Sequence, residues 1–185
     1  AAVANGVHGL YIFNGSTNNT IGGLTSTPGT GAGNVISGNT QDGISIGGGG
    51  VGQGVPGNST VIQGNLIGLA ANGTTALGNG NAGVEAVNSG ATIGDTDSQA
   101  RNVIAGNQQY GINFSNSGSN QNVLIRGNYI GTDITGQVGR PNPLGGVLFQ
   151  NAPGGVVGGT VAGAGNVIAA NGAAGVVVTG TQSAG

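Results

Sequence analysis

Apolar residues occur along this chain in short runs that are rich in Val and Ile and are bounded by Gly and Asn. Within several runs, such as those over 44–46, 84–87 and 112–114, apolar side chains alternate with polar or small ones. An amphipathic helix needs a longer segment with few glycines, whereas alternation is typical of a strand with one buried face. The pattern therefore predicts an all-β protein.

The phrase NVIAGNQQYGINF, which covers 102–114, has counterparts at 34–46 and 166–178. The three copies begin 68 and 64 residues apart. The repeat unit is therefore about 64 residues long and divides into two halves of about 33, each with three short β runs. We predict a single β-helix repeat domain over 1–185. Because the chain starts within repeat text and without a methionine, we expect it to be a segment of a longer or processed protein.

The corners between runs are longer than the two-residue Asn-Gly or Asp-Gly turns of β-hairpins, and equivalent runs lie a full half-unit apart. Stacking of equivalent runs gives parallel sheets in which each coil rises by one strand spacing, about 4.8 Å. Gly and Asn suit such corners because both tolerate a left-handed backbone. The sequence predicts a parallel β-helix (β-solenoid) of about five to six coils with loop insertions.

Asparagines recur at equivalent places beside these corners. A stacked amide can donate a hydrogen bond to one neighbouring coil and accept one from the other, forming a ladder of the kind seen in cross-β assemblies. The alternative is that these residues merely suit turns. We expect structural ladders formed by Asn34, Asn39, Asn65, Asn102, Asn107, Asn128, Asn166 and Asn171.

The phrases NVISGN, GNLIG, GNYIGTDITG and APGGVVGGTVAGAGNVIAAN resemble right-handed parallel β-helix repeats of large secreted or surface-exposed bacterial proteins, broadly of the pectate-lyase-like superfold. The resemblance covers nearly the whole chain. It implies a right-handed helix and an extracellular or cell-surface location. It does not imply an activity, because this scaffold carries lyases, hydrolases, adhesins and passive spacers alike.

The composition restricts the partners. Only 4% of residues are charged, the net charge is −2 and lysine is absent, so we expect no nucleic-acid partner, since phosphate binding depends on Lys and Arg. No apolar run approaches the roughly 20 residues of a membrane-spanning helix, so we expect no membrane insertion. The chain has no cysteine, which excludes disulfides and thiol chemistry.

Few residues are candidates for chemistry. Asp95 and Asp97, followed by Arg101, form an acidic and basic cluster that could hold a calcium ion or a sugar hydroxyl; the alternative is an ordinary polar loop. Glu85 is expected to point outward on a solvated face. His8 has no partner nearby in sequence, so we expect an ordinary surface or packing histidine. No catalytic or cofactor-binding residue is predicted.

These observations favour a non-enzymatic structural or adhesive segment of an extracellular protein. Open sheet edges at its ends could allow assembly end to end into a fibre, so its partners would be copies of itself or neighbouring domains of the parent protein. The alternative is a carbohydrate-active or carbohydrate-binding domain similar to a polysaccharide lyase or hydrolase, with an extracellular polysaccharide as its partner.

Overall fold

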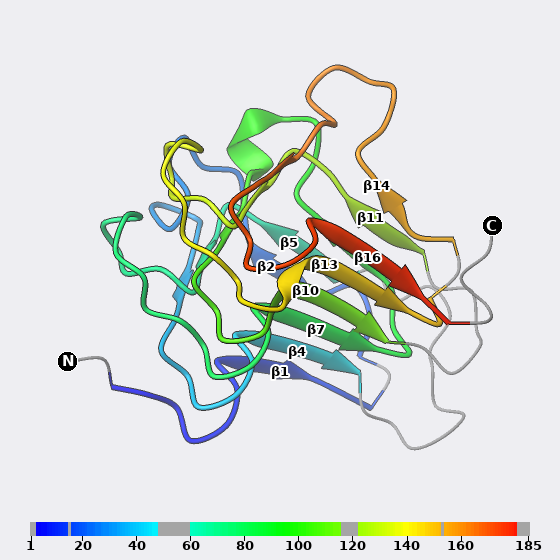
Figure 1. Ribbon diagram of the computed structural model, residues 1–185, viewed down its shortest axis with the longest axis horizontal. Coiled ribbons are helices and arrows are strands. Elements are labelled where there is room, and N and C mark those ends of the chain that lie inside the picture. The colour runs from blue at the N-terminus through cyan, green and yellow to red at the C-terminus, as the bar shows by residue number, and fades with distance from the viewer. Residues whose placement is uncertain (1–2, 15, 48–59, 116–121, 153, 181–185) are drawn as a thin grey trace.

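A computed structural model describes residues 3–14, 16–47, 60–115, 122–152 and 154–180 (Figure 1). Within these ranges the chain forms strands and one short 3-10 helix, η1 (Ser98–Ala100), and no α-helix. In the part of the chain that is described, no helix is both long and apolar enough to cross a membrane. The prediction of an all-β protein is confirmed.

The described strands form three parallel sheets, which we name A, B and C. Sheet A contains β1 (Leu10–Ile12), β4 (Ile44–Gly47), β7 (Val84–Val87), β10 (Tyr110–Ser115), β13 (Gly145–Gln150) and β16 (Val176–Thr179). Sheet B contains β2 (Thr20–Gly22), β5 (Thr60–Gln63), β8 (Ala91–Ile93), β11 (Val123–Ile125) and β14 (Val156–Val157). Sheet C contains β3 (Val35–Ile36), β6 (Leu66–Ile67), β9 (Val103–Ile104), β12 (Tyr129–Ile130) and β15 (Val167–Ile168).

The chain visits the three sheets in turn. Neighbours within each sheet are three strands apart in chain order, so β1 pairs with β4, β2 with β5 and β3 with β6. Figure 1 shows sheet A as a stack that runs in order from β1 to β16. We call one passage through sheets A, B and C a circuit. Stacked parallel sheets of this kind are compatible with a β-helix or solenoid, and equivalent runs pair in parallel as the repeat spacing predicts.

Inward side chains form columns along the stack, because the register places equivalent residues on top of each other. In sheet C the column contains Ile36, Ile67, Ile104, Ile130 and Ile168. The three central isoleucines are fully buried, whereas the two end members are only partly buried. Each fully buried isoleucine stabilises the fold by about 1.5–3 kcal/mol relative to an exposed one. The aliphatic core therefore depends on each circuit covering the next.

A smaller apolar cluster lies on the outer side of sheet C. Leu66 and Val103 are fully buried there together with Leu69, although they point away from the main core. Two equivalent loops cover this side, and each is closed by an antiparallel bridge, Leu69 with Ala76 and Thr132 with Gly139. The backbone N–H of Ile134 in the second loop donates to the carbonyl of Gly73 in the first at 3.0 Å. The loop insertions thus stack in the same way as the strands.

Candidate functional site

Two columns of asparagine side chains follow the corners of the stack. The B–C ladder, between sheets B and C, contains Asn34, Asn65, Asn102, Asn128 and Asn166. The C–A ladder, between sheets C and A, contains Asn5, Asn39, Asn79, Asn107, Asn142 and Asn171. In both, the amide Nδ2 of one residue donates to Oδ1 of the asparagine in the next circuit, at 2.7–3.2 Å.

Asn102 illustrates how a ladder residue satisfies its polar atoms without water. Its Oδ1 accepts from the backbone N–H and from Nδ2 of Asn65, both at 3.0 Å. Its Nδ2 donates to Asn128 Oδ1 at 3.0 Å and to the carbonyl of Ile62 at 2.8 Å. The residue is fully buried, where an unpaired amide would be costly. The ladder therefore ties three successive circuits together through one side chain.

The eight asparagines that the sequence singled out all lie in these two columns, but three ladder members were missed: Asn5, Asn79 and Asn142. A signal for them exists in the sequence, since every member of the C–A ladder is followed by Gly four residues later. At Gly83 a Cβ atom would lie 2.7 Å from Asn107 Nδ2, so only glycine fits beside the ladder. All six members share the spacing Asn-x-x-x-Gly, although the same spacing also occurs outside the ladder, for example from Asn18 to Gly22.

The residue before a C–A ladder asparagine can adopt a left-handed backbone. Gly38 and Gly106 both have φ of 73°, and Ala170, at the equivalent place, has φ of 58°. A left-handed conformation is unstrained for glycine and costs about 1–2 kcal/mol for other residues. Ala170 is therefore a strained corner.

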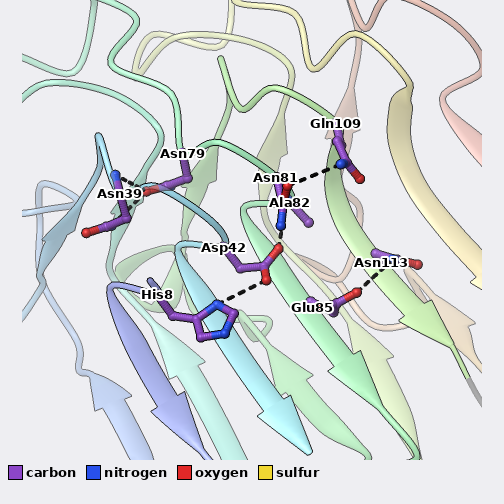
Figure 2. A network of polar contacts seen from close by, with 9 residues as sticks. All are labelled: His8, Asn39, Asp42, Asn79, Asn81, Ala82, Glu85, Gln109 and Asn113. Carbon is purple, nitrogen blue, oxygen red and sulfur yellow. Dashed lines mark hydrogen bonds and ion pairs between the residues drawn. The ribbon is translucent and has the colours of Figure 1, made fainter. Parts of the chain in front are cut away.

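A cluster of polar side chains lies on the outer face of sheet A, which we name the face cluster (Figure 2). His8 and Asp42 come two residues before the starts of β1 and β4, and Glu85 and Asn113 are paired in register on β7 and β10. Asp42 Oδ1 accepts from the N–H of Ala82 at 3.0 Å, and Asn113 Nδ2 donates to Glu85 Oε1 at 3.3 Å. The cluster thus joins four successive strands of sheet A.

His8 and Asp42 form an ion pair in this cluster, the one ion pair among the described residues. His8 Nδ1 lies 3.1 Å from Asp42 Oδ2. The same nitrogen is buried and has no hydrogen-bond partner, so this close contact is not a hydrogen bond. Asn113 Oδ1, at the other end of the cluster, is also buried without a hydrogen-bond partner. The face cluster therefore carries polar atoms that the protein leaves unsatisfied.

The carboxyl group of Glu85 is half-buried, and Asp42 influences its pKa. Burial, the negative charge of Asp42 and a hydrogen bond between the two carboxyl groups raise the pKa of Glu85 to about 7, and the hydrogen bond from Asn113 acts in the opposite direction. The neutral form of Glu85 is therefore favoured to a higher pH than in an exposed glutamate. Carboxyl groups beside an imidazole are side chains of the kinds that donate and accept protons in acid–base chemistry.

Exposed aromatic rings continue the face cluster beyond His8. The rings of His8 and Tyr11 have centroids 5.1 Å apart, and Tyr11 stacks on Phe13 at 4.9 Å with an interplanar angle of 14°. Tyr11 is 49% exposed and Phe13 47% exposed. A pair of exposed aromatic rings beside polar groups suits a ligand with one apolar and one polar side.

The structure changes the picture of two residues from the sequence analysis. Glu85 points outward as expected, but it is half-buried beside Asp42 rather than solvated. His8 has no partner nearby in sequence, but it lies beside Asp42, which is 34 residues away. Asp42, which the sequence did not single out, is 2% exposed and stands between the two.

Asp95 and Asp97 organise a turn. Asp95 Oδ1 accepts from the N–H of Thr96 at 2.7 Å, and Asp97 caps η1 by accepting from the N–H of Gln99 at 2.9 Å. Arg101 instead donates to a backbone carbonyl and lies over the Tyr129 ring, 4.2 Å from its centroid. Across the residues that the structure describes, no three His, Cys, Asp or Glu side chains gather closely enough to hold a metal ion.

Asp133 also has a local role. Its Oδ1 accepts from the hydroxyl and the N–H of Thr135 at 2.6 and 3.0 Å, and from the N–H of Val138 at 3.4 Å. Desolvation acts to raise the pKa of Asp133, but these hydrogen bonds together outweigh it and lower the pKa below its usual value. The carboxylate therefore holds the second loop on sheet C in shape.

Comparisons with protein-family models, with curated proteins and with solved structures give no match. The similarity to right-handed β-helix repeats therefore stays a prediction from the sequence.

Proposed function

We propose that this chain is a structural segment of an extracellular or cell-surface β-solenoid, non-enzymatic and mechanical in its role. We further propose a right-handed parallel β-helix of pectate-lyase-like type with about five to six coils, because parallel strands joined by a crossover are nearly always connected in the right-handed sense.

The observation that carries this proposal is the pair of continuous asparagine ladders. Buried amides whose hydrogen bonds go almost entirely to neighbouring circuits resist shear between circuits, and they leave no such group free for a ligand. The B–C and C–A ladders run parallel to the aliphatic columns, so polar and apolar contacts both stabilise the stacking of successive circuits. A stack held in this way is suited to act as a stiff spacer.

The ends of the stack support a partner made of further solenoid circuits. Among the described residues, β3 and β15 each pair on one side only. A hollow of about 550 Å³ at the first end includes Leu10, Ile21 and Ile36, and one of about 290 Å³ at the other end includes Phe149 and Val178. A neighbouring domain of the parent protein, or a second copy of the chain, would cover these apolar surfaces.

Light scattering and negative-stain electron microscopy of the isolated chain test this proposal. Rods or short filaments whose length grows with concentration are expected for end-to-end association. A stable monomer at all concentrations would exclude self-association and leave neighbouring circuits of a parent protein as the partner. A flexible, extended particle would contradict the structural role itself.

The second candidate is a carbohydrate-active or carbohydrate-binding domain, and the face cluster favours it. Tyr11 and Phe13 offer an apolar platform, and Asp42, Glu85 and His8 offer acid and base groups beside it. Incubation with polygalacturonate, alginate and neutral glycans tests it. Release of unsaturated or reducing ends that Glu85→Gln abolishes would replace the structural proposal with this one. Binding without cleavage that Tyr11→Ala abolishes would support a glycan-binding role.

A further inference from the structure

Several asparagines of the chain are followed directly by glycine. Four such steps lie wholly within the described residues: Asn5–Gly6, Asn72–Gly73, Asn79–Gly80 and Asn171–Gly172. Another, Asn14–Gly15, extends outside them. In an Asn-Gly step the backbone nitrogen of glycine can attack Cγ of the asparagine side chain, because glycine has no Cβ atom to shield its nitrogen and its backbone bends freely. Whether a step reacts therefore depends on how firmly the fold holds these two groups.

The fold holds three of the four steps by hydrogen bonds. The N–H groups of Gly73, Gly80 and Gly172 each donate to a backbone carbonyl, at 2.8, 2.9 and 3.0 Å. The asparagine side chains of these steps are held as well, with three hydrogen bonds at position 72 and four each at positions 79 and 171. These contacts would have to break before the nitrogen could reach Cγ, so the three steps are protected.

The step Asn5–Gly6 lacks this protection. Among the described residues, the N–H of Gly6 makes no hydrogen bond, and the side chain of Asn5 makes one, from Nδ2 to Asn39 Oδ1 at 2.7 Å. Both residues of the step are exposed. The carbonyl of Asn5 accepts from the N–H and the hydroxyl of Thr40 at 3.2 and 2.9 Å. Hydrogen bonds to this oxygen stabilise the negative charge that the peptide group acquires when the Gly6 nitrogen loses its proton.

We propose that Asn5–Gly6 is a site of spontaneous deamidation, at which the folded chain converts an asparagine of its own ladder into isoaspartate and aspartate. The Gly6 nitrogen gives its proton to solvent and bonds to Cγ of Asn5, the bond from Cγ to Nδ2 breaks, and Nδ2 takes up a proton and leaves as ammonia. Water then adds to either carbonyl carbon of the resulting succinimide and opens the ring. No oxidant, reductant or further reactant is required, and the inference is independent of the mechanical role proposed above.

The conversion breaks the first rung of the C–A ladder. Asn5 Nδ2 is the donor of that rung, and a carboxylate has no proton to offer Asn39 Oδ1. In isoaspartate the chain continues through the former side chain, so the carbonyl that accepts from Thr40 becomes a free carboxylate and its contacts change. Asn39 still donates to Asn79 Oδ1, so the later rungs remain.

The conversion also changes the charge of one end of the stack. A chain with a net charge of −2 gains one further negative charge. The new carboxylate would lie at the rim of a hollow of about 230 Å³ that includes Asn5, Val35 and Asn39. The modification therefore loosens and charges the first end while it leaves the inner circuits intact.

Peptide mapping by mass spectrometry tests the site. The chain is incubated at mildly alkaline pH, folded and in parallel unfolded in guanidinium chloride, and the isoaspartate content of each Asn-Gly step is followed. In the folded chain we expect Asn5 to convert at least about fivefold faster than the three protected steps, since one ordinary net hydrogen bond slows by this factor a reaction that must first break it. In the unfolded chain the four steps should convert at similar rates, because only the fold distinguishes them.

Gly6→Ala is the matched variant. Its added Cβ has no atom within 4 Å, so the fold can accommodate it, but it shields the attacking nitrogen and should slow the conversion of Asn5 severalfold. Amide exchange gives a second measurement: in converted molecules the Thr40 amide should lose protection. The Gln108 amide, which donates to the carbonyl of Asn79 at 3.0 Å in an inner circuit, should keep its protection.

Three results would each overturn the proposal. The first is conversion of Asn5 in the folded chain no faster than that of the protected steps. The second is equal conversion in Gly6→Ala and the unchanged chain. The third is Thr40 protection that stays the same after conversion.

Discussion

Replacing Asn102 by alanine is the most direct test of the asparagine ladders. The side chain is fully buried and makes four hydrogen bonds: two accepted from Asn65, one donated to Asn128 and one donated to the carbonyl of Ile62. At about 1 kcal/mol for each net hydrogen bond, we expect Asn102→Ala to lower the free energy of unfolding by about 4 kcal/mol.

The chain supplies a matched control in the same column. Asn34 is the first residue of the B–C ladder, and its side chain makes one ladder hydrogen bond, from Nδ2 to Asn65 Oδ1 at 2.9 Å. Asn34→Ala should therefore cost only about 1 kcal/mol, although the chemical change is the same. Asn102→Asp is a second control, because it retains an acceptor but removes both donors from a buried site, so we expect it to destabilise as well.

Urea unfolding followed by far-ultraviolet circular dichroism measures these differences. The expected order of midpoints is the unchanged chain, then Asn34→Ala, then Asn102→Ala, with similar slopes for the three. Equal losses at the two positions, or a loss below about 1 kcal/mol at Asn102, would refute the reasoning. Either result would mean that water or relaxation replaces the ladder bonds without cost, and that these asparagines matter only for their turns.

Three other substitutions test separate features by thermal unfolding. Gly83→Ala would place a Cβ atom 2.7 Å from three atoms and should cost about 1–3 kcal/mol, whereas Gly165→Ala, with nothing within 4 Å, should be nearly neutral. Ala170→Gly should stabilise the chain by about 1 kcal/mol, because it relieves a left-handed alanine; a lower Tm would contradict this. Asp133→Ala should cost about 2 kcal/mol at pH 7 through its lost hydrogen bonds. Because the pKa of Asp133 is lowered, that difference should shrink as the pH falls below its usual 3.8, and a constant difference would count against it.

The parallel, stacked arrangement of the strands could be predicted from the sequence because its repeats place the same elements in the same order. Each copy of the phrase that begins at Asn102 places a short sheet C strand, a corner and a sheet A strand in the same order, so equivalent residues must stack. The ladder members with this phrase were found for the same reason. Asn79 and Asn142 were missed because the residues before them belong to loops, which replace the familiar Val-Ile pair.

The face cluster was not predicted because its members are far apart in the chain. The contact of His8 with Asp42 depends on stacking register, and register is set by the hydrophobic pattern and the corner geometry of whole circuits. Had Asn5 been recognised as a ladder residue, the contact would have followed, since His8 and Asp42 each come three residues after a C–A ladder asparagine. The raised pKa of Glu85 then arises from burial, which no sequence spacing reveals.

The direction of the ladder hydrogen bonds has a consequence for synthesis of the chain. Every ladder asparagine except the last of each column, Asn166 and Asn171, donates to the asparagine of the circuit that follows it in sequence, so a circuit that has just left the ribosome displays donors on its growing edge. The next circuit to emerge brings the matching Oδ1 acceptors to that edge in the correct register. Each completed circuit is thus a template for the circuit translated after it, and the protein can fold in the order in which it is made.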